Sequence, residues 1–239
     1  MNRALYASAS GMAAEQQRLD VVADNLANAD VPGFKAATAT FASLGGDAPL
    51  GTVSTGSHRL FGQGKLMKTG GPFDVALDGP GFFVVDRDGQ RAYTRAGSFA
   101  RSADGRLRNA DGWALAGVRI PSKALDVTVA ADGRVTVTLA GGAHASAGRI
   151  RPALFDAPER LRTAGSAVFA ATQESGPAHV VDAGGERRPK VAFGMLERAN
   201  VSIVEAMMEI LAAQRAFEAN AKTVTTFDTV TQETINMIR

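Results

Sequence analysis

The sequence predicts an α+β protein in which a helix at each end of the chain flanks a central all-β domain. Two observations lead to this prediction: apolar residues recur at helical spacing near both termini, and short β-type runs alternate with turn residues between them. We expect an N-terminal helical region in residues 1–35, an extended connector in 36–69, the β-domain in 70–195 and a C-terminal helical region in 196–239.

An apolar stripe along the first region predicts an amphipathic helix over about residues 3–29. The stripe recurs at seven-residue intervals at Leu5, Met12, Leu19 and Leu26, and Ala9, Val22 and Ala29 occupy intermediate positions. Asp30-Val31-Pro32-Gly33 ends the helix, because proline lacks a backbone donor and disfavours helical geometry in the residue before it. The amides of Asn25 and Asn28 lie near this end, where they could bond either the backbone or a neighbouring helix.

The last region has a longer apolar repeat, in which spacings of four and three residues alternate as in a coiled-coil heptad. It predicts a helix over about residues 201–237, capped by Asn200 or Ser202 and roughly 50 Å long at 1.5 Å per residue. The apolar residues that we expect to make contacts are Ile203, Met207, Ile210, Phe217, Val224 and Ile235.

More apolar residues lie on this helix outside the repeat, at Val204, Met208, Leu211 and Val230. A single partner helix would leave some of this surface in water, whereas contacts with neighbouring subunits would bury it. Two arrangements stay open at this point. The terminal helices pair within one molecule, or they bind other molecules, and both can hold at once.

The middle of the chain has the pattern of an all-β sandwich or barrel. Runs of aromatic and β-branched residues such as Phe82-Phe83-Val84-Val85 are typical of strands. Turn signals separate these runs, because aspartate and glycine both tolerate left-handed backbone conformations and suit tight hairpins. The pairs are Asp88-Gly89, Asp104-Gly105, Asp111-Gly112 and Asp132-Gly133.

Composition argues against several classes of function. Lys and Arg exceed Asp and Glu by only 26 − 24 = 2, and no basic run with interleaved aromatics occurs, so we expect no nucleic-acid partner. The chain has no cysteine, and its three histidines, His58, His144 and His179, lack the spacing of a zinc site. Neither a nucleophile elbow nor a phosphate-binding loop is present. We therefore expect no metal, no cofactor and no enzymatic activity.

Membrane insertion is also not expected, because no stretch approaches 18 uninterrupted apolar residues. The N-terminus does not have the pattern of a cleaved secretory signal. Charged residues at Glu15, Arg18 and Asp20 arrive before any long apolar run could form.

The start of the chain resembles the N-terminal signature of flagellar axial proteins, the rod and hook family. The match consists of Leu19, Asp20, Ala23, Asn25, Leu26, Ala27, Asn28, Gly33, Phe34 and Lys35. Three further segments are similar to the family's segments and follow in the family's order: Gly64 to Phe83, Ala92 to Phe99, and the C-terminal helix from Asn200 to Lys222. The short segment from Phe34 to Gly62 is like the proximal type of rod protein, whereas the sequence RALYASASGM is more like the distal type, so both types stay open.

This resemblance implies a structural subunit of the bacterial flagellar basal-body rod. It implies that the terminal helices form a coiled-coil-like assembly domain, through which subunits polymerise into the tubular drive shaft that transmits torque from motor to hook. The implied partners are further copies of this chain, other flagellar rod and hook proteins, and the flagellar type III export apparatus, which exports such subunits to the periplasmic rod without a cleaved signal peptide.

The expected assembly interface combines the apolar residues of the two terminal helices with the side-chain amides of Asn25 and Asn28. The apolar residues are Leu5, Met12, Leu19, Val22, Leu26, Ile203, Met207, Ile210, Phe217, Val224 and Ile235. The alternative function is a stand-alone β-sandwich module that binds carbohydrate or protein and is oligomerised by its helices.

Overall fold

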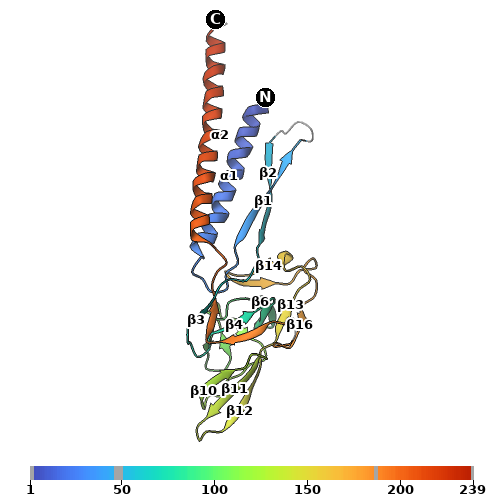
Figure 1. The fold of residues 1–239 in the computed structure, drawn as a ribbon. Helices are drawn as coiled ribbons and strands as arrows, with labels where there is room; N and C mark the ends of the chain where they lie inside the picture. The colour runs from blue at the N-terminus through green and yellow to red at the C-terminus, as the bar shows by residue number, and fades with distance from the viewer. Residues whose placement is uncertain (1–2, 46–50, 186–187, 238–239) are drawn as a thin grey trace. The chain divides into compact units, whose positions relative to one another are not determined.

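The computed structural model describes residues 3–45, 51–185 and 188–237, and its α+β architecture agrees with the prediction (Figure 1). The chain divides into two compact units. We call the first the helical unit (Met1–Asn28, Ala36–Leu60 and Val201–Arg239) and the second the β-unit (Ala29–Lys35 and Phe61–Asn200).

The helical unit contains the two long helices, α1 (Arg3–Ala27) and α2 (Ile203–Met237), which run side by side in opposite directions (Figure 1). Helix α1 ends ahead of the predicted Pro32 breaker. Ser202 caps α2 as expected, because its Oγ accepts a hydrogen bond from the backbone N–H of Glu205 at 3.4 Å.

Part of the predicted connector forms a hairpin within the helical unit. Strands β1 (Ala37–Leu44) and β2 (Gly51–Arg59) pair in antiparallel fashion, with a bulge between Thr40 and Phe41. The hairpin contacts α1, and the backbone N–H of Thr52 donates to Ser10 Oγ at 3.1 Å. A two-stranded ribbon is marginally stable by itself, so this packing is what supports it.

The β-unit is built from short antiparallel strands, most of them joined into one sheet. The order along this sheet is β14-β15-β6-β5-β9-β8-β7, with β13 pairing β5 and β16. Its strands are β5 (Phe82–Arg87), β6 (Gln90–Thr94), β7 (Ala100–Arg101), β8 (Leu107–Arg108), β9 (Ala114–Leu115), β13 (Pro152–Leu154), β14 (Arg162–Thr163), β15 (Val168–Ala170) and β16 (His179–Val180). A short 3-10 helix, η1 (Pro158–Arg160), precedes β14.

Three smaller sheets complete the β-unit. One is the meander of β10 (Ala124–Val129), β11 (Arg134–Leu139) and β12 (His144–Arg149). The other two pair strands that are far apart in the chain. They consist of β3 (Leu66–Lys68) with β18 (Met195–Glu197), and β4 (Val75–Asp78) with β17 (Lys190–Phe193).

Strand β5 lies between two apolar clusters, because alternate residues of a strand point to opposite faces. Phe83 and Val85 belong to the larger cluster, which also contains the buried Trp113. Phe82 and Val84 belong to a smaller aromatic cluster. Burial on both faces explains why this run is apolar throughout and not alternating.

The four Asp-Gly pairs lie in turns between strands, as predicted. The clearest is the two-residue loop between β5 and β6, where Asp88 and Gly89 have φ values of 52° and 80°. Positive φ at both central residues matches the twist of the flanking strands.

Candidate assembly interface

Helices α1 and α2 meet along a seam of small and apolar side chains. Ala206 and Ala213 are buried in it, and the helices approach closely where Gly11 faces Asn220. A Cβ added at Gly11 would lie 2.9 Å from Nδ2 of Asn220. The seam residues of α2 are spaced alternately by four and three, and they are Ala206, Ile210, Ala213, Phe217, Asn220, Val224 and Phe227.

The structure places the predicted interface residues at different depths. On α1, Val22 and Asn25 are buried. The other predicted residues of α1, and Asn28 just after it, are half-buried; those of α1 are Leu5, Met12, Leu19 and Leu26. On α2, the half-buried ones are Ile210, Phe217 and Val224. Ile203 and Met207 are exposed instead, and the side chain of Ile235 lies outside the described ones.

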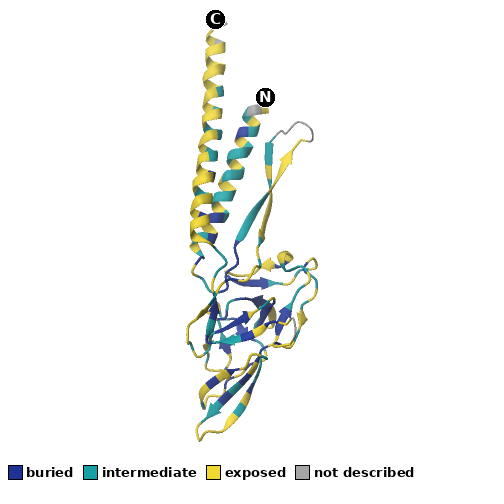
Figure 2. Cartoon of the chain, viewed as in Figure 1, coloured by how far each residue is buried: buried dark blue, intermediate teal, exposed yellow. Residues whose placement is uncertain are grey.

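The start of α2 carries a contiguous apolar surface that this chain leaves in water (Figure 2). We call it the outer apolar face, and it consists of Ile203, Val204, Met207, Met208 and Leu211. These side chains are 41% to 67% exposed. At 100° per residue, three of them (Val204, Met208 and Leu211) lie on roughly the opposite side of α2 from Ala206 and Ala213. The seam and the outer apolar face are therefore separate surfaces of one helix.

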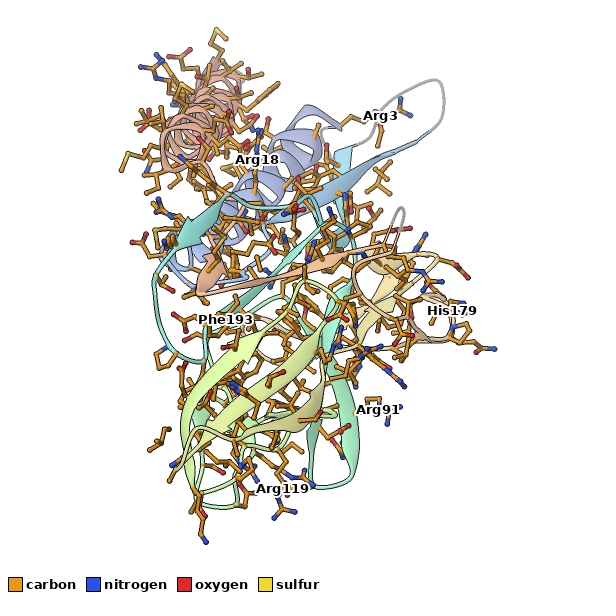
Figure 3. The ribbon with its side chains drawn as sticks, turned by 60° about the horizontal axis from the view of Figure 1, so that its bottom comes forward. Arg3, Arg18, Arg91, Arg119, His179 and Phe193 are labelled. Carbon is orange, nitrogen blue, oxygen red and sulfur yellow. The ribbon has the colours of Figure 1, made fainter. Side chains whose placement is uncertain are left out.

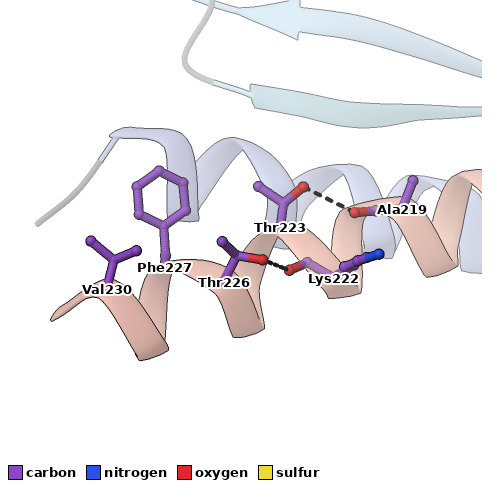
Figure 4. A pocket seen from close by; sticks show the side chains of 6 residues that line it. All are labelled: Ala219, Lys222, Thr223, Thr226, Phe227 and Val230. Carbon is purple, nitrogen blue, oxygen red and sulfur yellow. Dashed lines mark hydrogen bonds between the residues drawn. The ribbon is translucent and has the colours of Figure 1, made fainter. Parts of the chain in front are cut away.

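A groove of about 410 Å³ lies on the C-terminal half of α2 (Figure 4). Ala219, Lys222, Thr223, Thr226, Phe227 and Val230 line it. Thr223 Oγ1 donates to the carbonyl of Ala219 at 2.9 Å, and Thr226 Oγ1 donates to that of Lys222 at 2.8 Å. Because these two hydroxyls bond their own helix, an apolar side chain in the groove would not leave them unpaired.

The two predicted amides have different partners. Asn25 Nδ2 donates to the carbonyl of Ala37 at 2.7 Å, and the N–H of Ala37 donates to Asn25 Oδ1 at 2.7 Å. Asn28 Nδ2 donates to the backbone carbonyl of Asp24 at 2.8 Å. Asn25 thus joins α1 to the start of β1, whereas Asn28 bonds the last turn of its own helix.

A buried ion cluster in the β-unit was not predicted from the sequence. It consists of Lys35, Arg95 and Glu197, whose side chains are 0%, 3% and 0% exposed. Lys35 Nζ lies 2.6 Å from Glu197 Oε1 and also donates to the carbonyl of Gly62 at 2.7 Å. Arg95 Nη1 lies 3.6 Å from Glu197 Oε2, and Arg95 Nη2 donates to the carbonyl of Gly79 at 2.9 Å.

Burial dominates the electrostatics of this cluster. It lowers the pKa of Lys35 from 10.5; Glu197 opposes this shift and Arg95 adds to it. Burial also lowers the pKa of Arg95, again opposed by Glu197. The sequence signal that could have pointed here is limited to Lys35, a single charge between Phe34 and Ala36, because Glu197 is followed directly by Arg198 and does not stand out.

Within the described ranges, no group of three or more histidine and acidic side chains could hold a metal ion. His58, His144 and His179 are exposed and lie on three different strands. Figure 3 shows His179, Arg91 and Arg119 pointing outward from the β-unit. Neither α1 nor α2, as described, is long and apolar enough to cross a membrane.

Three protein families match parts of the chain. Residues 5–35 match the family described as flagella basal body rod protein. Residues 76–137 match the D1 domain of flagellar hook protein FlgE/F/G, and residues 193–237 match the C-terminal region of flagellar basal body rod FlgEFG proteins.

Individual relatives resemble the chain over nearly its whole length. The flagellar basal-body rod protein FlgG of Bacillus subtilis is 31% identical, with 100% of both chains covered. FlgG of Agrobacterium fabrum is 33% identical, with 95% of both chains covered. The flagellar basal-body rod protein FlgF of Caulobacter vibrioides is 33% identical over 93% of this chain and 92% of its own.

Proposed function

This chain belongs to the family of flagellar basal-body rod proteins, and from that premise we propose that it polymerises through its terminal helices into the tubular rod. Because its relatives are structural rod proteins, the chain is a structural subunit of the flagellar basal body and not an enzyme. They do not support the alternative of a stand-alone binding module. The polymer would transmit torque from motor to hook, and its partners would be further copies of this chain and other rod and hook proteins.

The outer apolar face of α2 is the observation that carries this proposal. Five large apolar side chains are exposed within its first three turns, although the seam with α1 already uses another side of the helix. Soluble monomers rarely leave such a contiguous apolar surface in water, so a neighbouring subunit is the expected occupant. Together with the groove at the other end of α2, this gives the helix contact surfaces at two levels along its length.

Repeated contacts of this kind build a polymer and not a closed ring if each subunit is related to the next by a rotation with a rise. The helices would then form a coiled-coil-like layer in which the α1–α2 seam is supplemented by seams between subunits. The predicted residues Ile203 and Met207 fit the second kind of seam, because they are exposed in the single chain.

Assembly of this type is compatible with export of the chain through the flagellar type III apparatus to the periplasmic rod, without a cleaved signal peptide. Helices that bury apolar surface only on binding pay for their ordering at that step, so α1 and α2 would gain much of their stability from subunit contacts.

The proposal is tested with the variant Met208→Lys/Leu211→Lys. Two charges on the outer apolar face should prevent burial against a neighbour, because an unpaired buried ammonium is strongly unfavourable. We expect the variant to be folded and exported, but to form no rods in electron micrographs and to leave a deletion strain non-motile.

The matched control is Leu125→Lys, which changes an even more exposed leucine (74%) on β10 of the β-unit. This variant should still assemble. Rod formation and motility at wild-type levels in Met208→Lys/Leu211→Lys would contradict the proposal.

A further inference from the structure

The buried ion cluster lies where two segments from opposite ends of the chain meet inside the β-unit. Lys35 ends the segment that follows α1, and Glu197 ends β18, which precedes α2. The two residues are 162 positions apart in the sequence. Their segments also bond through the backbone, because the N–H of Gly33 donates to the carbonyl of Glu197 at 2.7 Å.

The two cations do not contribute equally to holding the Glu197 carboxylate. Oε1 accepts hydrogen bonds from Lys35 Nζ at 2.6 Å and from the N–H of Gly64 at 2.8 Å. Oε2 and Arg95 Nη1 are 3.6 Å apart, and neither has a hydrogen-bond partner within the described chain. Lys35 is therefore the principal partner of this carboxylate, and Arg95 supplies a longer-range charge.

From this geometry we propose that the cluster is a conformational lock, in which docking of residues 29–35 depends on Glu197 and orders both chain ends together. A buried carboxylate needs a hydrogen-bonded partner, and so does a buried ammonium. Lys35 and Glu197 meet both needs only when the two segments are docked at once. Residues 29–35 follow the end of α1, and β18 precedes the start of α2. The lock therefore couples the end of α1 to the start of α2.

The charges predict an unequal response to substitution. With three ionised groups the cluster has a net charge of +1. Lys35→Met leaves Arg95 and Glu197 as a neutral pair, whereas Glu197→Gln leaves two buried cations without a carboxylate. Glu197→Gln should therefore release residues 29–35 more strongly than Lys35→Met does. The double variant Lys35→Met/Glu197→Gln removes one of these two cations and leaves Arg95 as the only buried charge, so it should be milder than Glu197→Gln alone.

Amide hydrogen exchange of the full chain tests the lock, with peptides covering residues 29–36 compared with peptides covering β5. We expect Glu197→Gln to speed exchange in residues 29–36 by at least about tenfold, with little change in β5. The double variant should return exchange in residues 29–36 toward the wild-type rate. The matched control is Glu174→Gln, which removes the exposed partner of Arg160 from a 3.2 Å surface pair and should change neither region.

Three outcomes would overturn the proposal. The first is unchanged exchange of residues 29–36 in Glu197→Gln, and the second is equal acceleration across the whole β-unit. The third is a double variant at least as perturbed as Glu197→Gln. If Glu197→Gln does not fold, recovery of folding in the double variant supports the lock, and failure of the double variant to fold contradicts it.

Discussion

At the scale of single residues, Asn25 shows how a helix side chain can bind the backbone of a strand in place of a neighbouring strand. Its side-chain amide offers one donor and one acceptor, which is the pair of groups that a backbone residue presents in a β-ladder. Asn25 is only 8% exposed, so leaving its amide without the N–H and carbonyl of Ala37 as partners would cost free energy. An aspartate could accept from the N–H but could not donate to the carbonyl. This two-sided demand explains why an amide suits the position.

Lys35 gives a prediction about pH at the same scale. Burial lowers its pKa in the folded state below the ordinary value of 10.5, so the unfolded chain holds this proton more tightly. Between the lowered pKa and 10.5 the unfolded state binds more protons, and the free energy of unfolding therefore gains a contribution as pH rises. The charged groups facing Lys35 are Glu197, which opposes the shift, and Arg95, which adds to it.

The measurement is the free energy of unfolding of wild type and Lys35→Met at a series of alkaline pH values. The difference between the two proteins should move in favour of wild type as pH approaches 10.5 from below. Lys123→Met, at an exposed lysine, corrects for general alkaline effects. A difference that stays flat, or that moves in favour of Lys35→Met, would show that the folded-state pKa of Lys35 is not lowered.

At the scale of elements, the helical period of α2 was predictable from the sequence but its phase was not. The apolar repeat includes Ile210, Phe217 and Val224, which are half-buried along the seam with α1. It also includes Ile203 and Met207, which are exposed, and it omits the buried alanines of the seam. Close helix contact favours small residues, and hydrophobicity alone ranks a large side chain above an alanine. The phase therefore depends on the partner helix, which one-dimensional periodicity does not describe.

The β-unit divides in the same way into local and long-range features. The hairpin turns were predictable because an Asp-Gly pair fixes its own backbone conformation. The pairings of β3 with β18 and of β4 with β17 join strands more than a hundred residues apart, and no local signal encodes them. Strands β17 and β18 directly precede α2 in the chain. The sequence therefore did not predict the strand pairings of the part of the β-unit that connects to this helix.

Gly64, just before β3, allows the closest of these long-range approaches. A Cβ at this position would lie 1.9 Å from the carbonyl oxygen of Arg198, and the N–H of Arg198 donates to the carbonyl of Lys65 at 2.9 Å. Gly64→Ala must push the two backbones apart, and it should lower the free energy of unfolding of the β-unit by about 1–3 kcal/mol. Urea unfolding followed by the fluorescence of Trp113 measures this change.

The control for this prediction is Gly165→Ala, where the nearest atom to the added Cβ is 3.4 Å away, in ordinary van der Waals contact. This substitution should change the free energy of unfolding by less than about 0.5 kcal/mol. Equal effects of the two substitutions would mean that the approach between Gly64 and Arg198 is not close in solution.

At the scale of the whole molecule, the buried ion cluster is the feature that the sequence concealed most completely. Lys35 belongs to the N-terminal motif, and Glu197 lies directly ahead of the predicted C-terminal helix, yet neither residue shows a periodic or spaced pattern with the other. Arg95 comes from a third segment, after β6. Only the fold brings the three together, and a charge that is buried looks in sequence like any other charge.

The two units of the molecule carry separate spectroscopic reporters, which gives a last prediction. Trp113 is the only tryptophan of the chain and is 4% exposed in the core of the β-unit, whereas α1 and α2 dominate the circular dichroism at 222 nm. In the single chain α2 is packed on one side only, while β5 is buried on both faces. We therefore expect the helical signal to be lost at a lower temperature than the Trp113 signal, with two transitions that do not coincide.

Deleting residues 201–239 should remove most of the first transition. The midpoint temperature of the Trp113 transition should change by only a few degrees, which corresponds to a small change in stability. Coincident transitions in the full chain, or loss of the Trp113 transition on deletion, would show that the β-unit depends on the helices for its own stability.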